Sequence, residues 1–145
     1  MTASPDGVLI VDKSAGPTSH DVVAVGRRAL GTSRVGHTGT LDPLATGVLV
    51  LVAGRATRLA RFMANDEKEY EARVAFGRST TTYDAEGATT GQTGRVPDRA
   101  TLSALLASRV GAQLQTPPAY SAKKVGGEVA YSAARRDAPL TLRPV

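Results

Sequence analysis

The chain has 145 residues, which is enough for one domain with a hydrophobic core, and its 41% hydrophobic and 21% charged residues are ordinary for a globular protein. It contains no cysteine and only two histidines, which excludes disulfides, thiolate metal sites and a histidine-rich metal site. The net charge of +5 is uneven, because basic blocks at 22–61 and 120–145 flank an acidic segment at 62–98. Although any one arginine is most simply read as solvated surface, two such blocks favour a polyanionic partner, nucleic acid first.

The first half of the chain predicts two strands and two helices. Gly7–Asp12 is a short apolar run typical of a strand, and Thr18 or Ser19 can cap a helix that Gly31 ends. Val48–Ala53 indicates a strand buried on both faces or a short buried helix. The Val48–Ala53 run is too short to span a bilayer, and the N-terminus has no signal-peptide pattern, so we expect a cytoplasmic protein. A helix is predicted over Ala56–Ala64, with its apolar residues on one side.

The second half predicts one clear strand and a mixture of shorter elements. In Lys68–Phe76, apolar residues including Tyr70 alternate with mostly charged ones, which is the period of a half-buried strand. The other expected features are loops with short strands at 77–94, a helix capped by Asp98, an irregular stretch at 115–127, a short helix at 128–136 and a strand-like end at 141–145. Helices and strands do not alternate regularly, so the sequence predicts an α+β fold.

The stretch GHTGTLDPLATG, at 36–47, raises the question of what a lone carboxylate does in a glycine-rich loop. It lacks the Gly-Lys-Ser/Thr ending of a phosphate-binding loop and the GxGxxG spacing of a dinucleotide fold. Alone, Asp42 before proline is most simply a turn residue. However, it is the only acid between Asp21 and Asp66, and an anion weakens a surface that merely binds phosphates. A nucleophile or base acting on a nucleotide would need that carboxylate.

Several segments, in order, resemble the motifs of the TruB-type tRNA pseudouridine synthases. GHTGTLDPLATGVL resembles their signature, and VDKSAGPTSHDVV resembles their N-terminal motif with Ser14 in place of the usual proline. KEYEA, TTTYDAEG and QTPPAYSAKKVGGEVAYSAAR resemble three later motifs, the last forming an RNA-gripping thumb. The resemblance implies an α+β core with a mixed, mainly antiparallel sheet and flanking helices. It also implies isomerisation of a flipped-out T-loop uridine of tRNA, without metal or organic cofactor.

The resemblance also implies roles for particular residues. Asp42 matches the catalytic aspartate, and Tyr70 matches a catalytic tyrosine that stacks under the flipped base and is placed to take its C5 proton. His37 matches a histidine that contacts RNA near that nucleotide. Three cations lie in matching segments and are expected to contact the RNA backbone: Lys13, Lys124 and Arg135. From the residues alone, Tyr70 could equally be core, and Asp84 could be structural or functional.

A later family motif of the type Gly-Thr-Tyr-Ile-Arg, whose arginine pairs with the catalytic aspartate, is not found in this sequence. We therefore expect residues 1–145 to be the N-terminal part of a catalytic domain, with a thumb near 115–139 and without the C-terminal RNA-binding domain. Such a part is expected to be marginally stable and poorly active, and the full-length protein to be a monomer without membrane contact. Two alternatives stay open: a non-catalytic RNA-binding module or tRNA-folding chaperone, and a nucleotide-binding protein that uses the glycine-rich loop.

Overall fold

The computed structural model describes residues 5–121, 123–136 and 138–145. The chain divides into two compact units, Met1–Tyr70 and Glu71–Val145. Both combine short helices with antiparallel strand pairs, so the predicted α+β class with mainly antiparallel sheets is confirmed. Within the described residues, no helix is long and apolar enough to cross a membrane.

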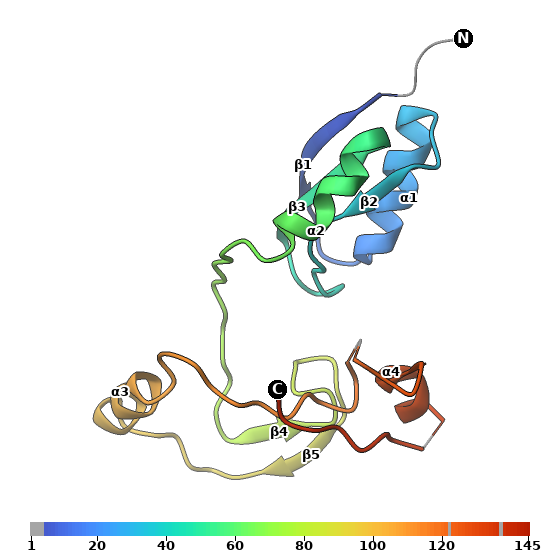
Figure 1. Cartoon of the computed structure of the whole chain (residues 1–145). Helices are drawn as coiled ribbons and strands as arrows, with labels where there is room; N and C mark the ends of the chain where they lie inside the picture. Colours follow the sequence, from blue (N-terminus) through green and yellow to red (C-terminus); the bar gives the residue numbers. More distant parts are fainter. Residues whose placement is uncertain (1–4, 122, 137) are drawn as a thin grey trace. The chain divides into compact units, whose positions relative to one another are not determined.

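The first unit is built on a three-stranded antiparallel sheet. The order of the strands is β1-β3-β2, and β1 pairs with β3 over its whole length, from Gly7 opposite Ala53 to Lys13 opposite Gly47. Figure 1 shows the sheet flanked by α1 and by the segment that ends in α2. The elements of this unit are β1 (Gly7–Lys13), α1 (Ser19–Leu30), β2 (Val35–His37), β3 (Gly47–Ala53), the 3₁₀ helix η1 (Gly54–Leu59) and α2 (Ala60–Met63).

Helix α1 begins and ends where local sequence rules place its caps. The Thr18 hydroxyl accepts a hydrogen bond from the Asp21 amide at 3.1 Å, and the Asp21 carboxylate accepts one from the Thr18 amide at 2.8 Å. This reciprocal capping box satisfies amides that the first turn leaves unpaired. Gly31 ends the helix in the left-handed conformation, with φ of 60°. The predicted helix and both of its boundaries are therefore confirmed.

The core of the first unit lies between α1 and one face of the sheet. Its buried members are Val23, Val35, Leu49, Leu51 and Ala53. The alternation along β3 puts Leu49, Leu51 and Ala53 on this face, and it leaves Val48 68% exposed on the other. Val48–Ala53 is thus a strand, as one of the two alternatives predicted, but it is not buried on both faces along its whole length.

The predicted helix over 56–64 is present in a tighter form. Residues Gly54–Leu59 adopt a 3₁₀ helix, and only Ala60–Met63 continue as α-helix. Its apolar side is incompletely covered, because Leu59 is 50% and Phe62 63% exposed.

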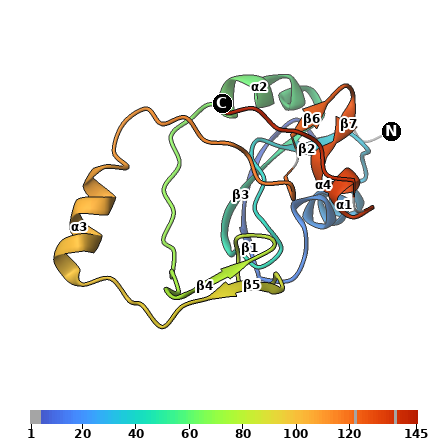
Figure 2. The ribbon, with the colours of Figure 1, turned by 90° about the horizontal axis from the view of Figure 1, so that it is seen from below.

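The second unit consists of short elements joined by long connections. They are β4 (Arg78–Thr80), β5 (Thr89–Gln92), α3 (Arg99–Ala107), β6 (Lys124–Val125), β7 (Glu128–Val129) and α4 (Ala130–Ala134). The strands form two separate antiparallel pairs, β4-β5 and β6-β7. Figure 2 shows α3 at the end of two extended connections, apart from the β4-β5 hairpin. The side chain of Asp98 caps α3 by accepting from the Thr101 amide at 2.7 Å, as predicted.

The thumb-like segment, 115–139, is largely irregular, as predicted, apart from the β6-β7 turn and α4, the predicted short helix. Residues 122 and 137 within this segment lie outside the described residues. Ala130, Ala133 and Ala134 are buried and anchor α4. The strand-like end at 141–145 is not part of a strand, although Val145 and Gln115 exchange two backbone hydrogen bonds of 3.0 and 3.1 Å.

The predicted strand over Lys68–Phe76 is wrong. Residues 67–75 carry no secondary structure, and the apolar side chains of the pattern are open to solvent, with Tyr70 67% and Val74 70% exposed. A strand exists only when a neighbour supplies hydrogen bonds, and no described strand pairs with this segment. The alternation correctly indicates that residues 68–76 form an amphipathic extended segment, but it does not show whether another strand pairs with it.

Candidate active site

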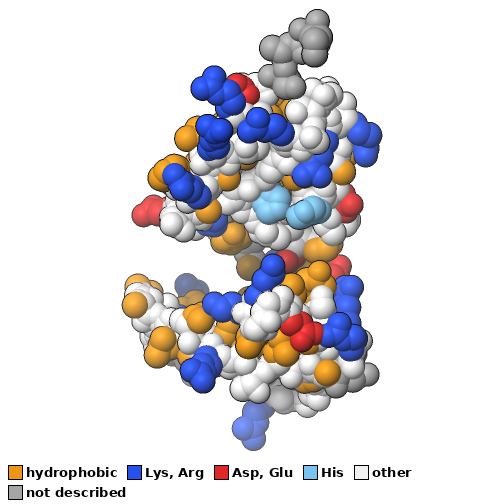
Figure 3. Space-filling model, turned by 45° about the vertical axis from the view of Figure 1, so that its right-hand side comes forward, with side chains coloured by type: hydrophobic (Ala, Val, Ile, Leu, Met, Phe, Trp, Pro, Cys, Tyr) orange, Lys and Arg blue, Asp and Glu red, His pale blue; other side chains and the backbone are white. Residues whose placement is uncertain are grey.

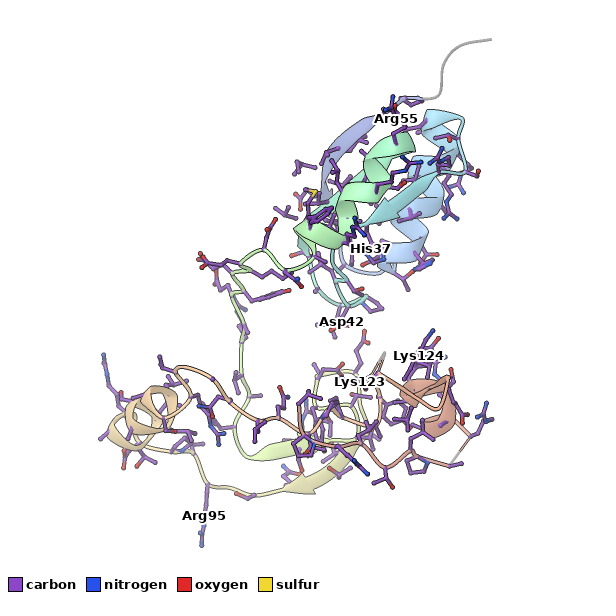
Figure 4. The ribbon with its side chains drawn as sticks, in the orientation of Figure 1. His37, Asp42, Arg55, Arg95, Lys123 and Lys124 are labelled. Carbon is purple, nitrogen blue, oxygen red and sulfur yellow. The ribbon has the colours of Figure 1, made fainter. Side chains whose placement is uncertain are left out.

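Asp42 lies in a loop of residues 38–46, called here the Asp42 loop, which joins β2 to β3. The loop leaves the sheet in register, because the Thr38 amide donates to the Val50 carbonyl at 3.1 Å. The Asp42 carbonyl then accepts from the Ala45 amide at 3.1 Å, which closes a turn with Pro43 at its second position. The Asp42 side chain is exposed. In the first unit, Figure 4 shows His37 and Asp42 at one end of the sheet and Arg55 at the other.

The buried side chain of Lys13 anchors the Asp42 loop. Lys13, the last residue of β1, is only 1% exposed. Its ammonium donates to the carbonyls of Ser14 at 3.0 Å, Pro43 at 3.2 Å and Ala45 at 2.8 Å. These three bonds use all three protons of the ammonium, and two of them end in the Asp42 loop. Lys13 therefore lies inside the protein, not at the surface where a backbone contact to RNA was expected.

Ser19, at the start of α1, also anchors the Asp42 loop through hydrogen bonds. The Ser19 hydroxyl accepts from the Leu41 amide and donates to the Leu41 carbonyl, both at 2.9 Å. Ser19 is 3% exposed, so these bonds are shielded from water. The Gly16 amide adds a bond to the Pro43 carbonyl at 2.8 Å. Leu41 and Pro43, the two neighbours of Asp42, are therefore held by hydrogen bonds, so the exposed Asp42 carboxylate is attached to a fixed backbone.

His37 ends β2, and its ring meets that of His20 from the first turn of α1. The ring centroids are 5.8 Å apart and the planes cross at 81°, an edge-to-face contact. The pale blue histidine side chains lie next to each other on the face seen in Figure 3. Burial lowers the pKa of His37 below its usual 6.5, and the nearby charge of His20 lowers it further. His37 is therefore an uncharged imidazole at neutral pH.

The other predicted site residues belong to other segments of the chain. Tyr70 is the exposed last residue of the first unit. Lys124 and Arg135 belong to the second unit and are exposed, and the Arg135 guanidinium lies 5.5 Å from the centre of the Tyr131 ring. The structure thus joins Lys13 directly to the Asp42 loop and places His37 just before that loop.

Sequence reasoning missed two contributors to the site, Ser19 and His20. The sequence marks Ser19 only as a possible helix cap, a role that Thr18 fills, and its bond to Leu41 spans 22 residues of sequence. His20 carried no signal beyond its type. Within the residues that the structure describes, no group of three histidine, cysteine or acidic side chains could hold a metal ion.

Comparison with known proteins gives consistent matches. The model of the TruB family pseudouridylate synthase N-terminal domain matches residues 27–145. The chain is 52% identical to tRNA pseudouridine synthase B of Thermus thermophilus over 134 residues, covering 92% of this chain and 43% of the relative. It is 51% identical to the same enzyme of Solibacter usitatus over 141 residues, covering 97% and 48%. The chain spans about half the length of these relatives.

One solved structure supports the same fold. A chain in the crystal structure of a Cbf5-Nop10-Gar1 complex matches with a TM-score of 0.53 and 31% identity. The match covers 81% of this chain and 31% of that one.

Proposed function

The chain belongs to the TruB family of pseudouridylate synthases, and on that premise we propose that it carries the catalytic carboxylate of an enzyme that converts uridine to pseudouridine in the T-loop of tRNA. The observation that carries the proposal is the Asp42 loop. An exposed carboxylate is held between two anchored residues, Leu41 and Pro43, on a backbone that a buried cation and a buried hydroxyl fix. Such preorganisation is what a reacting group needs and a solvated turn does not.

The reaction rearranges bonds without a net change of atoms. With the target nucleotide flipped out of the RNA stack, Asp42 acts in one of two ways. Its carboxylate bonds to C1′ while the C1′–N1 electron pair leaves with the uracil, or it removes the 2′ proton to give a glycal. The detached uracil rotates and C5 bonds to C1′, as the Asp42–C1′ bond breaks on the first route or as C2′ regains its proton on the second. The C5 proton is then released to solvent and N1 takes up a proton, so the atoms balance. The two routes share Asp42 and require no metal or organic cofactor.

The other site residues have supporting parts in the proposal. His37 contacts RNA as a neutral imidazole, so it contributes stacking and hydrogen bonding, not charge. Tyr70, which is exposed, stacks on the flipped base. Lys124 and Arg135, also exposed, bind phosphates from the thumb-like segment. Lys13 is assigned to positioning the loop, because its ammonium protons are already donated.

A second function, RNA binding or tRNA folding without catalysis, is favoured by one observation. The ion pairs among the described residues join Arg55 to Asp6 and Arg136 to Glu128, so Asp42 has no cationic partner there. A carboxylate that stabilises developing positive charge at C1′ gains from a cation that orients it. The chain would then bind RNA through its basic residues, and Asp42 would have no catalytic role.

The substitution Asp42→Asn separates the two functions. Tritium release from tRNA transcripts labelled at uridine C5 measures catalysis, and filter binding of the same transcripts measures affinity. The catalytic proposal expects release to disappear in Asp42→Asn while affinity is retained. Asp66→Asn is the matched control, because Asp66 is an exposed acid of the same unit whose carboxylate makes no described bond. Release from Asp42→Asn equal to that from the unchanged chain, with RNA binding intact, would favour the binding function.

A further inference from the structure

The loop between β4 and β5, residues 81–88, contains a strained tyrosine. Tyr83 has φ of 63°, and it is the only non-glycine residue with positive φ among those described. Left-handed backbone is uncommon outside glycine, asparagine and aspartate, and a bulky side chain there is an outlier. Strain of this kind persists only where surrounding bonds impose it, and it concentrates at functional positions.

The bonds that impose it converge on Asp84. One oxygen of its carboxylate accepts from the Thr82 hydroxyl at 2.5 Å and from the Glu86 amide at 2.9 Å. Its carbonyl accepts from the Thr80 hydroxyl at 2.7 Å, and Thr80 is 7% exposed. The Thr82 bond lowers the pKa of Asp84, so the carboxylate stays ionised at neutral pH and the network stays closed. Asp84 has a structural role in the described loop.

The Tyr83 ring, which the strained backbone carries, is largely exposed to solvent in the described structure. Tyr83 is 78% exposed, more than any other aromatic residue described, so packing of the ring within its unit does not offset the strain. The same hairpin carries exposed hydroxyl side chains, those of Ser79, Thr81 and Thr90. An exposed ring on a hairpin with exposed hydroxyl groups suits the base and sugar of a nucleotide, because the base stacks on the ring while hydroxyls bond to the ribose.

We propose that Tyr83 is a stacking platform for an unpaired base of the RNA substrate. The proposal rests on the proposed function in that it takes RNA as the ligand. Single-stranded bases are the RNA feature that aromatic side chains recognise, since paired bases hide their faces in the helix. The loop network fixes the backbone that carries the ring before RNA binds, which lowers the ordering cost of binding.

Replacing Tyr83 by glycine tests this, because glycine removes the ring and relieves the strain together. The probe is a tRNA T-stem-loop with 2-aminopurine in its loop, whose affinity is titrated by fluorescence. We expect Tyr83→Gly to bind roughly 5- to 100-fold more weakly, the range for loss of one base stack. Its melting midpoint should be no lower than that of the unchanged chain, since a left-handed position suits glycine. Tyr83→Phe should retain affinity, because the ring faces are kept.

Val96→Ala is the control, because Val96 is 72% exposed in the same unit and carries no ring. Affinity of Tyr83→Gly equal to that of the unchanged chain overturns the proposal. A lowered melting midpoint in both Tyr83→Gly and Tyr83→Phe also overturns it, because the hydroxyl would then be structural. RNA binding that is lost in Tyr83→Gly, together with tritium release that is unchanged in Asp42→Asn, supports the stacking site while refuting the catalytic role of Asp42. A chain that binds no RNA at all refutes both.

Discussion

Replacing Lys13 by methionine removes the ammonium that joins the end of β1 to the Asp42 loop. Methionine keeps the apolar stem of the 1%-exposed side chain, but the carbonyls of Ser14, Pro43 and Ala45 lose their donor. A net hydrogen bond to a charged group contributes about 1.5–3 kcal/mol, and desolvating a buried ammonium costs several kcal/mol, which methionine avoids. The Gly16 amide still serves the Pro43 carbonyl. We therefore expect the free energy of unfolding to fall by about 2–3 kcal/mol.

Urea unfolding followed by circular dichroism measures this change, with Lys68→Met as the control. Lys68 also donates to two carbonyls, those of Ala64 at 2.8 Å and Asp66 at 2.9 Å, but it is exposed. Water replaces its bonds, so the control should change stability by less than about 0.5 kcal/mol. Equal changes in the free energy of unfolding for the two substitutions would refute the conclusion that Lys13 anchors the Asp42 loop.

RNA binding provides an independent check on the same variant. A phosphate-binding lysine contributes to the salt dependence of affinity, and its loss lowers the slope by about one. If Lys13 anchors the loop, the salt dependence of RNA affinity should keep the same slope in Lys13→Met, because the ammonium is inside the protein. Unchanged stability together with a reduced slope in Lys13→Met would show that Lys13 contacts RNA, as the sequence first suggested.

Two further predictions concern local interactions of the first unit. Thr18→Ala should lower the free energy of unfolding by about 1 kcal/mol, the usual effect of losing a helix cap, as measured by urea unfolding. It should also raise the pKa of Asp21, observable by NMR titration, since the Thr18 hydroxyl is the main cause that lowers it. The folded pKa of His37 is below its unfolded value near 6.5, so the unfolded state binds the proton first and stability should fall as pH drops from about 6.5 towards the folded pKa. His37→Asn should flatten this part of the stability profile, and an unchanged slope would contradict the shift.

What the sequence predicted well depends on contacts close along the chain. The capping box of Thr18 and Asp21 spans three residues, and Gly31 ends α1 through its own backbone preference. The Asp-Pro pair marks a turn, which the bond from the Ala45 amide to the Asp42 carbonyl confirms, whereas strand β2 before it is not predicted. Such features follow from local rules, because the groups that satisfy each other are a few residues apart.

Lys13 shows why the rest was not predictable. Lysine is almost never fully buried, so a lysine in a basic protein is expected at the surface. Its burial depends on the carbonyls of Pro43 and Ala45, which are 30 and 32 residues away. Backbone carbonyls carry no sequence signal, since every residue has one. Sequence could select Asp42 by type and surroundings, but it could not show what holds it.

The segment 67–76 shows the complementary limit, in which a correct pattern lacks its partner. Alternation specifies which side chains share a face, and a strand also needs a neighbouring chain to accept and donate along its edge. Tyr70, Val74 and Phe76 retain the alternating order, yet all three are exposed because nothing described covers them. An exposed amphipathic segment gains most from a partner that buries the apolar face and pairs the edge. For Tyr70 this has a functional consequence, because the proposed stacking role requires a ring in a defined position. The Asp42 loop already has such definition through Lys13 and Ser19, whereas Tyr70 would acquire it only when its segment is paired.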